Sequence, residues 1–135
     1  MTIKTVLYWA ARLVAAVIMF QTLFFKFSGA EESIYIFSTV GMEPWGRYGV
    51  GFFELVASLL LIVNRTAWFG ALIALGLMAG AIGMHLTLLG IEVQGDGGYL
   101  FLLAVIVSVA SAYVLWVNRD HIKTLVQRNT GSLAG

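Results

Sequence analysis

The sequence predicts an all-α integral membrane protein built as a four-helix bundle. Three observations predict it: 60% of the 135 residues are hydrophobic, only 11% are charged, and the apolar residues gather in four long stretches. Soluble domains carry about 25% charged residues, so water is not the main solvent of this chain. A helix needs ~20 residues to cross a hydrocarbon core of ~30 Å. The predicted spans cover 6–27, 47–63, 67–89 and 99–117 of a single transmembrane domain, 1–135, and a short tail follows at 118–135.

The loop after the first span predicts a short interfacial helix. Ser28 with Glu31 three residues later matches a capping box, which typically begins a helix. Ile34 and Phe37 then supply an apolar face, and Pro44 follows the end of the element. We therefore expect a fifth, shorter helix at the membrane surface.

Small residues predict how the third span packs. Only residues 64–66 separate it from the second span, so these two spans are expected to form an antiparallel hairpin. Gly76 and Gly80 make a small-xxx-small pair, and membrane helices associate through such residues because their backbones can approach closely. A neighbouring face also carries small residues, with a histidine at its end: Ala67, Ala71, Ala74, Ala81 and His85.

The distribution of charge predicts the orientation. Basic residues concentrate near the termini and in the second loop, at Lys4, Arg12, Arg65, Arg119, Lys123 and Arg128. Because positively charged segments stay in the cytoplasm, both termini and the tail 118–135 of this multi-pass protein are expected to be cytoplasmic. Arg12, at the cytoplasmic end of the first span, is expected to snorkel to the interface.

Polar side chains within the spans are the candidate site residues, because such groups are costly in a bilayer and usually have a partner or line a cavity. The rise of ~1.5 Å per residue puts three of them in one layer of the outer half, and two more lie near the outer ends. The candidates for ligand binding or proton handling are Glu54, His85, Gln21, Lys26 and Arg47.

Two interpretations of Glu54 stay open. In the first, it only forms an ion pair with Lys26 or Arg47 that ties the first two spans together. In the second, it is a desolvated carboxylate that handles a proton or binds a polar headgroup, with His85 as its partner. Gly51 lies one turn from Glu54 on the same helical stripe, which leaves room for a pocket open to the outer side. His85 has its own alternative, a hydrogen-bonded packing role.

Several functional classes are excluded or disfavoured. The absence of cysteine excludes disulfides, thiolate metal sites and iron–sulfur ligation within the chain. The net charge of +1, without a basic stripe, gives no reason to expect nucleic acid. His85 and His121 are expected near opposite membrane faces, so no haem or other metal site is predicted and no cofactor is intrinsic.

The sequence resembles the DoxX family of small four-helix bacterial inner-membrane proteins. The similarity runs from about residue 6 to 116. It rests on the end of the first span, 24–29, with its apolar-Lys segment, and on the turn Val40 to Pro44. Further on it rests on Phe53-Glu54-Leu55, on Met84-His85 in the third span, and on Gly97-Gly98 before the fourth.

The resemblance implies a quinone-interacting membrane subunit associated with a redox complex. The family takes its name from a subunit linked to thiosulfate:quinone oxidoreductase and terminal oxidase activity. We expect this chain to be at most a non-catalytic or quinone-binding subunit, because it lacks cysteine and intrachain haem ligands. Alternatives are a lipid or apolar small-molecule binding protein, and an assembly or stabilising partner of a membrane complex. The expected partners are the lipid bilayer, a quinone or lipid ligand, redox-complex subunits and a second copy of the chain.

Overall fold

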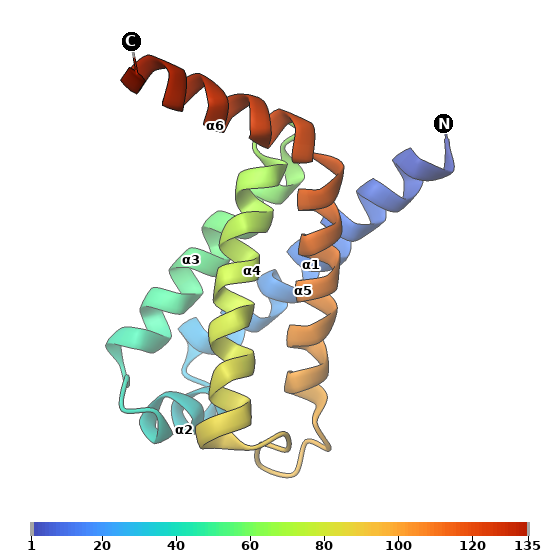
Figure 1. Ribbon diagram of the computed structural model, residues 1–135. Helices are drawn as coiled ribbons and strands as arrows, with labels where there is room; N and C mark the ends of the chain where they lie inside the picture. The colour runs from blue at the N-terminus through green and yellow to red at the C-terminus, as the bar shows by residue number, and fades with distance from the viewer. Residues whose placement is uncertain (1, 135) are drawn as a thin grey trace.

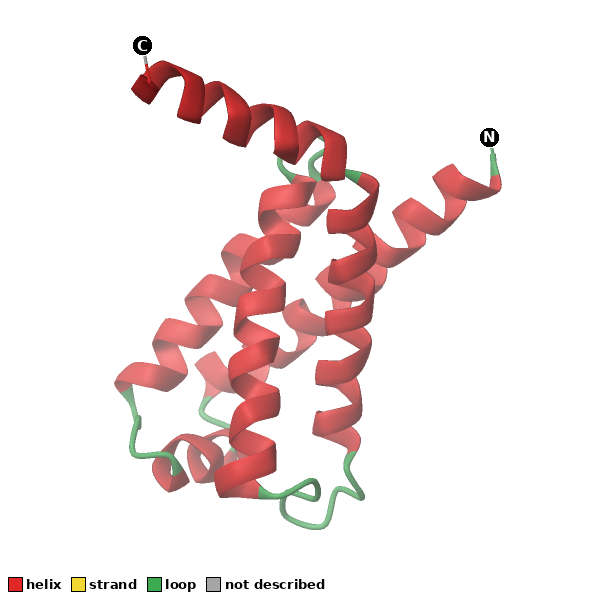
Figure 2. Ribbon diagram, viewed as in Figure 1, coloured by secondary structure: helices red, strands yellow, loops and turns green. Residues whose placement is uncertain are grey.

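The computed structural model describes residues 2–134, with side chains described as far as residue 128, and these residues form helices and short connections without any strand. Four helices are long and apolar enough to cross a membrane: α1 (Ile3–Ser28), α3 (Trp45–Ile62), α4 (Ala67–Met84) with its extension η1 (His85–Leu89), and α5 (Tyr99–Val117). The all-α membrane bundle predicted from the sequence is confirmed, and the observed spans differ from the predicted ones by at most three residues at either end. Figure 2 shows the helices and the loops that join them.

The four long helices form a ring in the order α1, α3, α4, α5. α1 packs against α3 and α5, and α4 packs against the same two helices from the other side. Figure 1 shows α1 beginning, and α6 (Arg119–Ala134) leaving, at one end of the bundle. We call this end the terminal face, and we call the opposite end, with α2 (Glu31–Thr39) and the loop before α5, the α2 face.

A short helix in the loop after the first span is confirmed as α2 (Glu31–Thr39), but its predicted capping box is wrong. Ser28 is the last residue of α1, and its hydroxyl donates a hydrogen bond to the Phe25 carbonyl. Gly29 then adopts a left-handed conformation with φ 71°, which ends α1. α2 begins after Ala30, which has no side chain that can cap it. The tail, for which no structure was predicted, forms helix α6.

The α3–α4 hairpin is confirmed, but its close approach depends on a different glycine from the predicted pair. A Cβ on Gly70 would lie 2.8 Å from the Ala57 carbonyl oxygen and from the Leu61 nitrogen, so only glycine fits there. A Cβ on Gly76 or Gly80 would meet no atom within 4 Å. The small-xxx-small pair therefore takes no part in packing within the described chain, because this half of α4 borders a cavity rather than a neighbouring backbone.

Arg12 does not snorkel to the interface as predicted. Its side chain is 1% exposed, and its guanidinium donates hydrogen bonds to the carbonyls of Leu61 and Ile62, both at 2.7 Å, and to Asn64 Oδ1 at 2.8 Å. The Trp9 ring lies 3.7 Å from the guanidinium carbon. The end of α3 leaves carbonyl groups without helical partners, and Arg12 is drawn inward because it satisfies them.

Candidate functional site

A cavity of about 460 Å³ lies in the half of the bundle nearer the α2 face. All four long helices contribute to its wall, and α2 and η1 close it at the α2 face. Most of the lining is apolar, and it includes Met19, Phe25, Leu77, Met78 and Met84. A few polar groups interrupt this surface, which is the usual composition of a small-molecule site.

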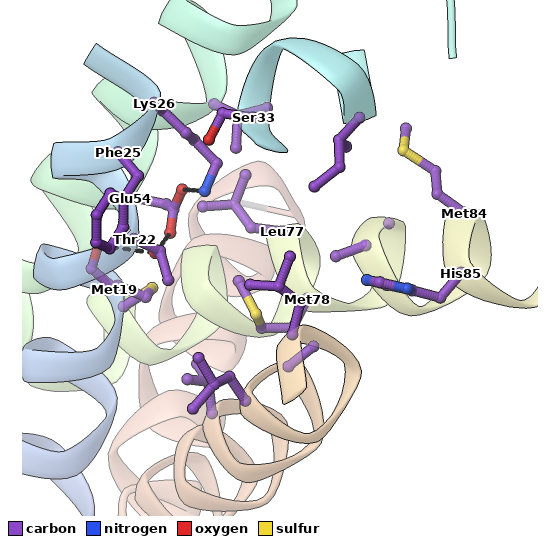
Figure 3. Close-up of a pocket in the computed structure, with 18 of the residues that line it drawn as sticks. Met19, Thr22, Phe25, Lys26, Ser33, Glu54, Leu77, Met78, Met84 and His85 are labelled. Atoms are coloured by element: carbon purple, nitrogen blue, oxygen red, sulfur yellow. Dashed lines mark hydrogen bonds and ion pairs between the residues drawn. The ribbon is translucent and has the colours of Figure 1, made fainter. Parts of the chain in front are cut away.

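The main polar group in the wall is a cluster of three side chains from α1 and α3. Lys26 Nζ lies 2.7 Å from Glu54 Oε1, and the Thr22 hydroxyl donates a hydrogen bond to Glu54 Oε2. Glu54 is 1% exposed, so both carboxylate oxygens have partners away from bulk water. Figure 3 shows the three side chains meeting at one wall of the cavity. The ion pair expected in one interpretation of Glu54 is therefore present, and its cation is Lys26.

Helical periodicity positions this cluster. On α1, Met19, Thr22 and Lys26 follow one another at three and four residues, so they share the face that looks toward α3. On α3, Glu54 and Ser58 lie on the buried stripe, and the Ser58 hydroxyl donates to the Glu54 backbone carbonyl at 2.7 Å. Ser58 thus leaves the carboxylate free for its partners on α1.

Gln21 does not join the site. It is exposed and does not line the cavity, whereas its neighbour Thr22 does. Successive residues differ by about 100° around a helix. Gln21 therefore lies at the depth of the cavity but on a side of α1 that faces away from it. The space expected beside Gly51 is also absent, because the Phe27 ring fills it at 3.1 Å from a Cβ position on Gly51.

Arg47 is buried but braces the helices instead of lining the cavity. Its Nε donates to both carboxylate oxygens of Glu43, at 2.9 and 3.0 Å, and its Nη1 donates to the backbone carbonyl of Lys26. This last bond holds the final turn of α1 against the start of α3. Arg47 therefore fixes the backbone from which the Lys26 side chain extends.

His85 lines the same cavity but is not the direct partner of Glu54. It is 5% exposed, its Nδ1 lies 2.9 Å from the Gly90 carbonyl oxygen, and its ring packs edge-on against Phe101. A carbonyl oxygen only accepts hydrogen bonds, so Nδ1 carries the proton and a neutral ring keeps Nε2 as an acceptor. Figure 3 shows His85 on a different side of the cavity from Glu54 and Lys26.

A family model described as DoxX matches residues 7–87. The chain belongs to the DoxX family. Glu54, Lys26 and His85 all lie within the matched residues. Together with the four apolar helices, this membership makes the chain a multi-pass membrane protein. Comparisons with curated proteins and with solved structures find no match.

The DoxX cavity has a second carboxylate, which the sequence analysis did not single out. Glu32 of α2 lines the cavity, and its Oε1 is buried without a hydrogen-bond partner among the described residues. Burial raises the pKa of Glu32, and the negative charge of Asp96 raises it further. Its spacing from Ile36, which also lines the cavity one turn later, is the sequence signal that places Glu32 on the inner side of α2.

Asp96 holds the loop that closes the α2 face of this DoxX protein. Its carboxylate accepts hydrogen bonds from the backbone N–H groups of Val93, Gly98 and Leu100, at 3.0, 2.8 and 3.2 Å. Burial opposes ionisation, but these hydrogen bonds to the carboxylate outweigh it and lower the pKa of Asp96. Asp96 thereby caps α5 and holds the loop before it in a fixed conformation.

Within the described part of the chain, no three histidine or acidic side chains come together in a way that could hold a metal ion. The polar groups of the cavity are instead separate donors and acceptors. Such an arrangement suits an organic ligand that has polar atoms at more than one edge.

Proposed function

We propose that this DoxX protein binds the headgroup of a quinone in its cavity and acts as a quinone-interacting subunit of a redox complex in the bacterial inner membrane, with both termini cytoplasmic. One observation carries the proposal: a buried carboxylate, ammonium and hydroxyl cluster forms part of the wall of an otherwise apolar cavity. A quinone combines polar oxygens with a flat apolar ring and an apolar tail, so its chemistry matches both parts of the lining.

Each polar group of the cavity can make a different contact with a bound quinone. The ammonium of Lys26 can donate a hydrogen bond to a quinone oxygen, and Glu54 can accept a proton from a quinol hydroxyl. His85 offers Nε2 as an acceptor on another side of the cavity. Glu32, with its raised pKa and unpartnered oxygen, suits proton exchange toward the α2 face. The electrons themselves require an acceptor in another subunit.

An apolar tail also has a route out of the cavity. Gly76 and Gly80 line it and are exposed on the outer surface of α4. Neither carries a side chain, and a Cβ at either position would touch nothing. The bundle is therefore open to lipid along this part of α4, and a quinone tail could lie there while its headgroup faces Lys26.

The test is a solvent extract of the protein purified in mild detergent, analysed by mass spectrometry for stoichiometric quinone. Glu54→Gln removes the carboxylate charge inside the cavity. Glu43→Gln is the matched control, because Glu43 is also paired with a cation but does not line the cavity. We expect quinone in the wild type and in the control, and its loss from Glu54→Gln. Quinone absent from the wild type, or equal in all three proteins, would contradict the proposal.

A second candidate function is the binding of a lipid or another apolar small molecule. The mostly apolar lining and the lateral opening at Gly76 and Gly80 favour it. The same extract separates the two candidates, because a stoichiometric lipid in place of quinone would support this carrier role. Such a ligand would undergo no redox change when a quinone reductant is added.

A further inference from the structure

A second cavity lies at the terminal face, at the far end of the bundle from the first. It measures about 430 Å³ and is lined by Asn64, Arg65, Trp68, Asn118 and His121. These residues come from the α3–α4 connection, the start of α4 and the junction of α5 with α6. The proposed quinone function makes no use of this cavity.

The charge in this cavity belongs to Arg65. The other nearby arginines already interact with other residues of the chain. Arg12 donates to a carbonyl at the end of α3, and Arg119 donates to the Trp116 carbonyl at 2.8 Å and stacks on the Trp116 ring. Arg65 is exposed and forms no ion pair or hydrogen bond with any residue whose side chain is described. An unpaired guanidinium beside a cavity favours an anion as its occupant.

Two further polar groups of the lining, Asn64 and His121, supply hydrogen-bond donors, whereas the Asn118 amide nitrogen already donates to the Tyr8 hydroxyl and the Val114 carbonyl. Asn64 uses its Oδ1 to accept from Arg12, so its amide nitrogen remains a donor. His121 packs against Trp68 at 6.0 Å between ring centroids, and no described residue contacts its ring nitrogens through a hydrogen bond. No carboxylate lines the cavity to repel an anion.

The surroundings place this cavity at the height of lipid headgroups. It lies where the apolar spans Trp45–Ile62 and Tyr99–Val117 end, and Trp68 is the kind of residue that anchors at a membrane interface. α6 leaves the bundle here and runs across its end (Figure 1). The contact between His121 and Trp68 holds the start of α6 against α4. A headgroup from the adjacent leaflet can therefore reach the cavity without leaving the bilayer.

We infer that this cavity binds the phosphate of an acidic phospholipid, with Arg65 as the charge partner and Asn64 and His121 as hydrogen-bond donors. Trp68 packs beside the headgroup at the membrane interface. The site recognises phosphoryl chemistry, and its position at the end of the spans selects a lipid as the source. Basic pockets between membrane helices commonly serve this purpose.

The experiment is native mass spectrometry of the full-length protein in mild detergent, titrated with phosphatidylglycerol or with phosphatidylcholine of the same acyl chains. We expect phosphatidylglycerol to bind more tightly. Arg65→Gln should weaken its binding roughly tenfold, since a charge-assisted hydrogen bond is lost. Lys123→Gln removes an equal charge from α6 outside the lining and should leave binding unchanged. Arg65→Lys, which keeps the charge, should restore part of the affinity.

Three results would overturn the inference. Equal binding of the two lipids would show that the phosphoglycerol charge is not recognised. Equal losses in Arg65→Gln and Lys123→Gln would indicate a diffuse surface charge rather than this cavity. Displacement of the lipid by inorganic phosphate at equal concentration would identify free phosphate, not a phospholipid, as the ligand. Thermal unfolding of each variant checks that the fold is retained.

Discussion

Lys26 Nζ and Glu54 Oε1 lie 2.7 Å apart and join α1 to α3 inside the bundle. The pair matches the first interpretation of Glu54, because it ties two spans together. It also borders a cavity, so a role of Glu54 in ligand binding stays a prediction. Its contribution to stability and its contribution to binding can be separated by substitution.

Removal of Lys26 should destabilise the protein more than removal of the whole pair. Lys26→Met leaves the Glu54 carboxylate buried without its cation, which typically costs about 3–5 kcal/mol. Lys26→Met combined with Glu54→Gln should recover much of that loss, because no buried charge remains. The free energy of unfolding in mixed detergent micelles measures both. Lys4→Met, at an exposed position near the start of α1, is the control; a double variant less stable than Lys26→Met would contradict this account.

Thr22 and Gln21 are neighbours that should behave differently. Thr22→Val keeps the shape of the side chain but removes the hydroxyl that bonds Glu54 Oε2, and a buried acceptor without a partner costs about 1–3 kcal/mol. Gln21→Val alters an exposed residue and should change stability by less than about 0.5 kcal/mol. Unfolding of the two variants under the same conditions compares them. Equal effects would mean that the Thr22 hydroxyl does not support the carboxylate.

Asp96 should give the α2 face a dependence on pH. Asp96→Ala removes three hydrogen bonds to backbone N–H groups and should cost about 1 kcal/mol at neutral pH, as for other helix caps. The pKa of Asp96 is lowered in the folded protein. The ionised group therefore stabilises the fold fully above the ordinary aspartate pKa of about 3.9, and this is lost as the pH falls through the lower folded-state value.

Thermal unfolding of wild type and Asp96→Ala from pH 7 down to pH 3 measures this effect. The difference between the two should shrink toward the acid end. Glu92→Ala is a control from the same loop, since among the described residues Glu92 accepts one long hydrogen bond, of 3.4 Å, from the Gly97 N–H. A difference that stays constant with pH would show that the charge of Asp96 is not involved.

Substitutions at two glycines of α4 can distinguish a ligand opening from a subunit-docking surface. Gly76 and Gly83 are both exposed and a Cβ on either would touch nothing, but only Gly76 lines the cavity. If the opening admits a ligand, Gly76→Leu should reduce the co-purified ligand and Gly83→Leu should not. If this surface instead binds a partner subunit or a second copy, both should reduce co-purification of that partner. Ligand content and complex size from the same preparation give the two measurements.

Hydropathy was sufficient to predict the spans, because every residue of a spanning helix contributes to the same signal. Depth along a helix was also predictable, and it grouped Glu54 and His85 around one cavity. The rotation of each helix about its axis could not be predicted. Neighbouring side chains point about 100° apart around a helix, and α1 is apolar on most sides. Depth alone therefore indicated Gln21 and gave no sign that Thr22 lines the cavity, or that the Phe27 ring fills the space beside Gly51.

Hydrogen bonds between side chains and backbone carbonyls could not be predicted from the sequence either. Arg12 was expected in the headgroups because its position near the end of a span is typical of snorkelling residues. Its actual partners are main-chain carbonyls at the end of α3, and these carry no residue-specific signal. The same holds for His85, which bonds the carbonyl of Gly90.

The pairing of Arg12 with Leu61 sets an order of events during biosynthesis. The two residues are separated by 49 positions in the chain, so the first span leaves the ribosome well before the carbonyls that accept hydrogen bonds from its guanidinium. A charged residue costs about 2.5–3.5 kcal/mol at the centre of an isolated span on insertion scales, and less toward the end of the span, where Arg12 lies. Before α3 is made, the Arg12 guanidinium has none of these partners and is expected to stay among the lipid headgroups. The buried position of Arg12 therefore depends on the second span.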